Sequence, residues 1–175
     1  MGLWKLSAAA ILVVAGAAQA AIYFESEDND SLALANDIGI YGAPGDGILV
    51  DGTIGNQDVD WFRFTLTDYA TLVVASVFDR NNSGGDGILG LFNSAGNLIV
   101  EDDDEGIGLM PSLQYAGLAA GSYYFAVSGY DDFGYVGDHP EQFDYKLVIG
   151  INIPTPGVMT FAGLGGLACI RRRRA

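Results

Sequence analysis

Two short acidic segments of this sequence have the residue types and the spacing of a site for a hard metal ion. In the segment ESEDND, residues 25–30, Glu25, Glu27 and Asn29 alternate along the chain. Alternate residues of an extended chain face the same side, so these three side chains can present oxygens together. The segment DVD, residues 58–60, has the same spacing. Because Ca²⁺ takes six to eight oxygen ligands, the candidate calcium ligands are Glu25, Glu27, Asn29, Asp30, Asp58 and Asp60.

A third acidic segment, EDDDE at residues 101–105, follows a predicted strand. Neither Asp28 nor Asp102 begins an EF-hand loop, because no glycine stands at the sixth loop position after either of them. The alternative to a metal site is a solvated acidic surface, and the spacing alone leaves both interpretations open.

Catalytic motifs are absent from the sequence. His139 is the single histidine, and neither a HExxH helix, a GxSxG elbow nor a phosphate-binding loop occurs. A carboxylate pair such as Asp103 and Glu105 has the residue types for glycosidase chemistry. Numerous exposed carboxylates, however, are typical of a surface rather than an active site. We therefore expect no enzymatic activity.

The charge is divided sharply along the chain. All 22 acidic residues lie between Glu25 and Asp144, whereas four of the eight basic residues stand together at 171–174. An acidic body repels phosphate, which excludes nucleic acid as a partner. The single cysteine, Cys169, excludes an intrachain disulfide, so stability must come from a core, supported by metal if metal binds.

Short apolar and alternating segments with turn residues between them predict an all-β domain. Eight strands are predicted in one antiparallel β-sandwich or jelly roll. SLALAND, residues 31–37, is the one candidate for a short helix in the body. The eight predicted strands are 47–54, 58–66, 70–78, 87–93, 97–102, 112–118, 122–130 and 142–151.

The first 20 residues have the pattern of a signal peptide. Lys5 precedes an apolar run, and Ala18-Gln19-Ala20 places small residues at the −3 and −1 positions of a cleavage site after Ala20. We expect an exported mature chain with its domain at 21–152. An uncleaved anchor helix is the alternative.

The order of several short motifs resembles the bacterial pre-peptidase C-terminal domain family. The motifs are ESEDND, GTIGNQDVDWFRF, LGLFNSAGNLIVEDD, LAAGSYYFAV and YKL, and together they extend over residues 25–150. The resemblance implies a β-sandwich of the kind appended to secreted peptidases and other surface proteins. Its collagenase members hold Ca²⁺ with a similar acidic motif. Carried over by position, this implicates Glu25, Glu27, Asn29 and Asp30, with Asp58 or Asp60 closing the site.

The last segment, residues 153–175, is similar to a PEP-CTERM sorting signal, which an exosortase-type membrane enzyme recognises. The apolar run Val158–Ile170 is short for a membrane span. A helix that is held in the membrane only until the enzyme cuts tolerates that length, whereas a permanent anchor is the alternative. Thr155 stands where the family has glutamate. The signal residues are Pro154, Thr155, Pro156, Gly157, Arg171, Arg172, Arg173 and Arg174.

These features together predict a non-enzymatic surface or matrix protein that is briefly anchored in the inner membrane and then exposed outside the cell, where surface polysaccharide or a matrix protein is a possible partner. The alternative is a carbohydrate- or protein-binding module; a secreted hydrolase is a weaker one. For a binding module, the loop 129–143 offers an aromatic surface in Tyr130, Phe133 and Tyr135. The same rings can instead pack on the core as a lid, and the sequence leaves this open.

Overall fold

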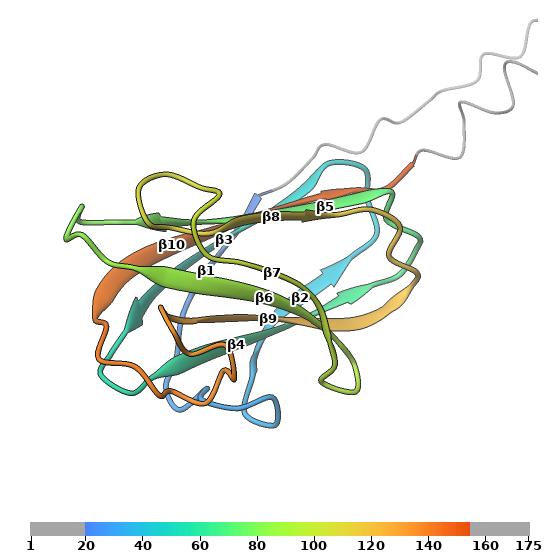
Figure 1. Ribbon diagram of the computed structural model, residues 1–175. Helices are drawn as coiled ribbons and strands as arrows, with labels where there is room; N and C mark the ends of the chain where they lie inside the picture. Colours follow the sequence, from blue (N-terminus) through green and yellow to red (C-terminus); the bar gives the residue numbers. More distant parts are fainter. Residues whose placement is uncertain (1–19, 155–175) are drawn as a thin grey trace, which may run out of the picture.

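The computed structural model describes residues 20–154 of the chain. Ten strands form two five-stranded sheets, which lie as two layers in Figure 1. One sheet has the order β1-β3-β10-β5-β8 and the other has the order β2-β4-β9-β6-β7. The strands are β1 (Ala20–Phe24), β2 (Asn36–Tyr41), β3 (Asp46–Ile54), β4 (Val59–Leu66), β5 (Leu72–Asp79), β6 (Gly87–Asn93), β7 (Leu98–Asp102), β8 (Ser112–Tyr115), β9 (Gly121–Gly129) and β10 (Phe143–Asn152).

The all-β prediction is confirmed, and all eight predicted strands form as β3 to β10 with ends shifted by at most three residues. The strand number was wrong, because β1 and β2 are added at the front. The helix expected at 31–37 is also absent: Ser31–Leu34 form a turn, closed by the Leu34 amide on the Ser31 carbonyl at 2.9 Å, and β2 begins at Asn36. The predicted signal and tail helices lie outside the described residues. Among residues 20–154, no helix is long and apolar enough to cross a membrane.

The sandwich is not purely antiparallel, because β1 pairs with β3 and β2 pairs with β4 in parallel. The first strands alternate between the sheets, so β1 and β3 are separated by one strand of the other sheet and run the same way. The strands β3, β10, β5 and β8 neighbour strands of opposite direction and pair antiparallel.

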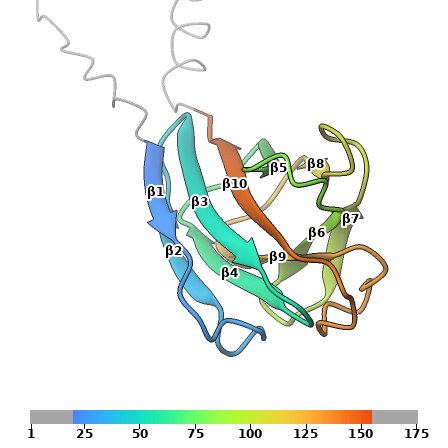
Figure 2. The same ribbon diagram turned by 90° about the vertical axis from the view of Figure 1, so that its left-hand side faces the viewer.

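Alternating strand direction gives the sandwich two unlike ends. β1 begins and β10 ends at the top of Figure 2, which we call the proximal end. The opposite, distal end carries five loops, namely 25–35, 55–58, 80–86, 103–111 and 130–142. Backbone hydrogen bonds join several of them, including Gln57 to His139 at 3.3 Å and Tyr130 to Asp86 at 3.0 Å. Residues distant in sequence therefore meet at the distal end.

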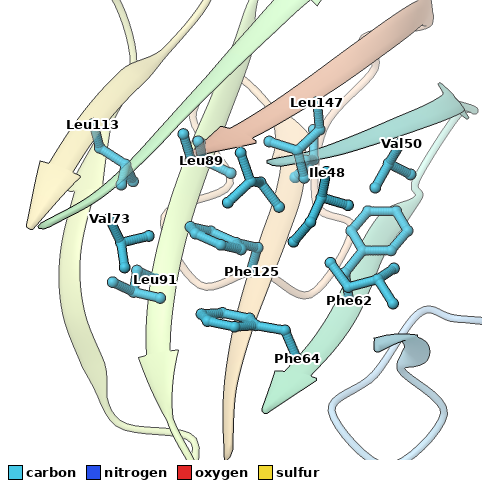
Figure 3. Packing of buried hydrophobic residues seen from close by; sticks show 14 of the residues in the cluster. Ile48, Val50, Phe62, Phe64, Val73, Leu89, Leu91, Leu113, Phe125 and Leu147 are labelled. Atoms are coloured by element: carbon cyan, nitrogen blue, oxygen red, sulfur yellow. The ribbon is translucent and has the colours of Figure 1, made fainter. Parts of the chain in front are cut away.

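One main core lies between the two layers. Phe62, Phe64 and Phe125 from one sheet contact Val50 and Leu147 from the other (Figure 3). Phe64 and Phe125 stack with centroids 5.2 Å apart. Alternation along β4 and β10 sends these apolar side chains inward, and each buried large side chain contributes about 1.5–3 kcal/mol to stability. This core fixes β4, the strand that carries Asp60.

A second, smaller cluster covers the outer face of β4, β9 and β6. Trp61, Phe92 and Tyr135 contact one another there, with Tyr135 contributed by the loop 130–142. The loop is held in place by Asp132, whose carboxylate accepts hydrogen bonds from Ser128 Oγ and from the amides of Val136 and Gly137. Of the two interpretations of this loop, the lid therefore holds for Tyr135: its side chain is 5% exposed and packs on the sheet, so it is not part of an exposed aromatic surface.

Candidate metal centre

The acidic loop, residues 25–35, crosses from one sheet to the other at the distal end and is tied down along its length. The Glu25 amide donates to the Asp51 carbonyl at 3.0 Å, and the Trp61 amide donates to the Asn29 carbonyl at 3.1 Å. The Asn36 side chain bonds both the amide and the carbonyl of Ser26, at 2.8 and 2.9 Å. These contacts place the loop directly against the start of β4.

This placement brings the candidate ligands together. One carboxylate oxygen from each of Glu25, Glu27 and Asp60 lies within 4.8 Å of the others, and the same is true of Glu27, Asp30 and Asp58. Glu27 belongs to both sets, so the sets adjoin. Asp60 is fully buried, whereas Glu27 and Asp30 are exposed. The cluster is therefore buried on the side of Asp60 and open to solvent on the side of Glu27 and Asp30, where a small ion can enter.

Asn29 completes the cluster from the buried side. Its side-chain oxygen faces two acceptors, Glu27 Oε2 at 3.0 Å and Asp60 Oδ1 at 3.1 Å, and a half-turn of the amide would place the NH₂ group there as a donor to both. The first orientation directs three oxygens at one point, which is the arrangement that a hard cation requires. The second satisfies the same atoms without an ion.

Hydrogen bonds from outside the cluster orient its carboxylates. The hydroxyl of Tyr145, a buried core residue, donates to Asp60 Oδ2 at 2.6 Å. The Thr53 amide donates to Glu25 Oε2 at 2.6 Å, and the Gly55 amide donates to Asp58 Oδ2 at 2.7 Å. Each of these carboxylates thus has one oxygen held by the protein and a second oxygen free to bind an ion, as supporting residues around metal sites do.

Burial and mutual repulsion make the cluster hold protons strongly when no cation is bound. Burial raises the pKa of Glu25 to about 7, with the charge of Glu27 adding to the effect. Burial and the charge of Glu25 raise the pKa of Asp60 well above its usual range. The pKa of Asp30 is raised by burial and by Asp58. A divalent cation would relieve both causes, because it compensates the buried charge and screens the repulsion.

Calcium affinity should therefore depend on pH near neutrality. An ion must displace the proton of Glu25, so we expect binding to be at least about tenfold weaker at pH 6 than at pH 8. The stability of the metal-free protein should change with pH in the opposite direction to calcium affinity. Native Glu25 keeps its proton up to about pH 7, whereas an ordinary glutamate loses it near pH 4.5. The native state then binds more protons in this window, so the free energy of unfolding falls as pH rises through it.

Calorimetric calcium titrations at pH 6, 7 and 8, together with thermal melts in EDTA from pH 5 to 8, measure both effects. Equal affinity at pH 6 and 8, with a metal-free midpoint that rises with pH, would contradict the proposed cluster.

Carboxylates of raised pKa are also found in hydrolases, but their setting here differs from an active site. Asp60 is 0% exposed and cannot touch a substrate. Two surface grooves of the described residues, of about 230 and 280 Å³, are lined by other residues. The oxygens of this cluster lie within 4.8 Å of one another, a spacing that suits an ion.

The structure thus brings all six sequence-predicted ligands into one cluster. The third acidic segment, residues 101–105, is not part of this cluster. Within that segment, the Asp102 carboxylate accepts hydrogen bonds from the amides of Glu105 and Ser112. Of the sorting-signal residues, Pro154 is the last that the structure describes; Thr155, Pro156, Gly157 and Arg171 to Arg174 lie outside. Tyr145 was missed as a supporting residue, since its apolar strand pattern indicated only a core position.

Comparisons with known proteins add limited information. No family model matches the chain, and no curated protein matches it either. Among solved structures, the chain is similar to the pre-peptidase C-terminal domain of collagenase from Bacillus anthracis, with 20% identity, a TM-score of 0.44, and 66% of this chain and 93% of that chain covered. It is also similar to Aeromonas hydrophila PliG, a periplasmic inhibitor of g-type lysozyme, with 18% identity, a TM-score of 0.42, and coverages of 66% and 99%. At these scores the two likenesses carry no argument about calcium, partner or location.

Proposed function

We propose that this chain is an exported, non-enzymatic β-sandwich that binds Ca²⁺ in its acidic loop and uses the ion to hold its distal end together. The observation that carries the proposal is the convergence of Glu25, Glu27 and Asp60, and of Glu27, Asp30 and Asp58, within 4.8 Å. The side-chain amide of Asn29 lies against Glu27 and Asp60, and a half-turn of this amide decides whether its oxygen or its NH₂ group faces them.

The chemistry of the donors favours calcium over other metals. All are hard oxygens, which suit Ca²⁺ and Mg²⁺ rather than zinc or copper. The single histidine, His139, is buried, its Nε2 bonds the Asp58 carbonyl at 2.6 Å, and it does not belong to either group of converging ligand atoms. Mg²⁺ requires near-ideal octahedral geometry, whereas the irregular ring of carboxylates offers the higher coordination number that Ca²⁺ takes.

Calcium should stabilise the folded domain, because the ligands come from the acidic loop, the 55–58 loop and β4 and meet only after folding. A metal that binds only the native state adds about 2.7 kcal/mol when present at 100 times its dissociation constant. Thermal melts of the full chain in EDTA and in millimolar Ca²⁺, with Mg²⁺ as the control, test this. Identical midpoints at matched ionic strength would refute a calcium-supported fold.

We propose further that the segment 153–175 delivers the domain to the cell surface, with an exosortase-type enzyme as processing partner. The support is the sequence pattern of Pro154-Thr155-Pro156, the apolar run and the four arginines. Positive residues after a short apolar segment fix the cytoplasmic side of a span. The last strand ends at the proximal end, so an anchor there would leave the calcium centre pointing away from the membrane.

Exchanging Pro154 and Pro156 for alanine should trap the full-length protein in the inner membrane of the native host, because the cutting enzyme then lacks its motif. A chain that is only anchored would keep its surface location after the same exchange. Intact mass spectrometry of the surface-exposed form decides between them: loss of Arg171 to Ala175 is expected, and a surface form that retains these residues would rule out processing.

A further inference from the structure

The distal end exposes apolar side chains that the fold does not need for its core. Ile107 in the loop 103–111 is 73% exposed and Leu109 is 49% exposed. In the neighbouring loop 130–142, Tyr130 and Phe133 are 45% and 49% exposed and contact each other edge to face, with centroids 6.2 Å apart. Both loops bond to the start of β6, since the Gly87 amide donates to the Leu109 carbonyl and the Tyr130 amide donates to the Asp86 carbonyl, and both present apolar groups to solvent.

A groove of about 230 Å³ runs between the loops 80–86 and 103–111. Its walls are held by the main chain: the Gly87 amide donates to the Leu109 carbonyl at 3.2 Å, and the Gly106 amide donates to the Met110 carbonyl at 2.9 Å. The groove has the size of one or two side chains and a mainly apolar lining, which includes Phe78, Asp79, Asn82, Ile107, Leu109 and Met110.

Asp86 lies next to the groove and bonds the loop that carries the aromatic pair, and three further carboxylates act on it electrostatically. Asp86 follows the groove residue Gly85, and its carbonyl accepts the Tyr130 amide at 3.0 Å. Burial raises the pKa of Asp86, and the charges of Asp104, Glu141 and Asp103 raise it further. Its Oδ1 atom is buried and has no hydrogen-bond partner among the described residues. Arg80, a basic residue at this end, is already paired with Asp51 and Asp144.

We infer that the distal surface, defined by the groove, the carboxylates around Asp86 and the Tyr130–Phe133 pair, is a docking site for a basic polypeptide segment that carries apolar side chains. An apolar side chain of the partner enters the groove, and its lysine or arginine side chains lie over the carboxylates and against the exposed rings. This inference rests on the proposed surface role, and its residues are separate from the calcium ligands.

The other occupants fit less well. Tyr130 and Phe133 are inclined by 76° and offer no flat platform for a sugar ring. A neutral glycan would also leave the carboxylates without a counter-charge. A second copy of this chain would bring the same acidic surface against itself, which like-charge repulsion opposes.

The test uses the purified full chain in Ca²⁺ and, as the probe, a synthetic peptide of four Arg-Leu repeats. A Glu-Leu peptide and cellohexaose serve as the other ligands, and sedimentation measures self-association. We expect saturable binding of the Arg-Leu peptide alone. The double variants Ile107→Ser with Leu109→Ser, and Asp103→Asn with Asp104→Asn, should each weaken it by about tenfold. All four residues lie on the loop 103–111, away from the core, so folding should be unaffected.

Matched controls lie towards the proximal end, where Ile40→Ser and Asp68→Asn change an exposed apolar and an exposed acidic residue. They should leave peptide affinity within about twofold. Equal weakening by these controls would show that only the overall charge matters, and it would overturn the inference. Binding of cellohexaose, self-association through this surface, or no peptide binding at millimolar concentration would overturn it as well. Thermal melts of the same variants distinguish the two proposals. If calcium still raises the melting midpoint but no peptide binds, the docking site is refuted and the proposed calcium site is not.

Discussion

Replacing Asp60 with asparagine is expected to stabilise the metal-free protein and to abolish its stabilisation by calcium. Asp60 is fully buried beside Glu25, and both causes that raise its pKa also oppose folding when the carboxylate is charged. Asparagine has the same shape and can still accept the hydrogen bond from Tyr145. Folding must either bury the charge of Asp60 or keep the group protonated above its ordinary pKa, so removing this carboxyl should add about 1–2 kcal/mol in EDTA at pH 8.

In the presence of calcium, the same variant should lack the stabilisation that the wild type gains from the ion. An amide supplies no charge to the ion, so we expect calcium affinity to fall at least about 100-fold. The wild type should therefore melt at different temperatures in EDTA and in Ca²⁺, whereas Asp60→Asn should melt at the same temperature in both. The control is Asp102→Asn, which alters a carboxylate that bonds two amides outside the cluster and should keep the calcium shift. An Asp60→Asn protein that is less stable in EDTA and still gains stability from calcium would contradict the account.

Replacing Gly52 with alanine is expected to destabilise the protein and to weaken calcium binding. Gly52 lies in β3 beneath Glu25, and a Cβ atom built there would overlap the Glu25 carboxylate and lie 2.5 Å from Cζ of Tyr145. Both neighbours would have to move, although Glu25 is a proposed ligand and the Tyr145 hydroxyl donates to Asp60. Overpacking of this kind costs about 1–3 kcal/mol, and calcium binding should weaken with it.

Gly150→Ala is the matched control for this substitution. Gly150 is also a strand glycine of the same sheet, but a Cβ atom there meets nothing within 4 Å. Alanine should be neutral or stabilising by up to about 1 kcal/mol, because glycine loses more chain entropy on folding. Urea unfolding of both variants, with and without Ca²⁺, gives the comparison. Equal stabilities for Gly52→Ala and Gly150→Ala would mean that the space beneath Glu25 is not occupied as described.

Much of the fold could be predicted from the sequence, because strands β3 to β10 are short apolar or alternating segments separated by turn residues such as glycine and asparagine. The convergence of the candidate side chains could also be predicted in part, since alternate carboxylates in ESEDND and DVD needed only an extended backbone to align; their role as calcium ligands stays a prediction. The two segments lie about 30 residues apart, and their meeting depended on the acidic loop crossing to β4, which no local pattern indicates.

The misses have physical causes as well. β1 and β2 are edge strands of their sheets. Their residues are less buried than those of a central strand, so their sequences lack the clear apolar pattern that marks one. SLALAND has apolar spacing like a helix, yet Leu32 and Ala35 pack on the outer cluster from a turn. The burial of Tyr135 depends on Asp132 folding the loop 130–142 back over Trp61, a hydrogen-bonding effect that aromatic composition cannot show.

The central claim, that these side chains form a calcium site, is tested most directly by isothermal titration calorimetry of the full chain with Ca²⁺ at pH 8. The account predicts saturable binding in the wild type that excess EDTA removes, and no saturable binding in Asp60→Asn. The same heats of dilution in both proteins, or equal binding in both, would contradict it.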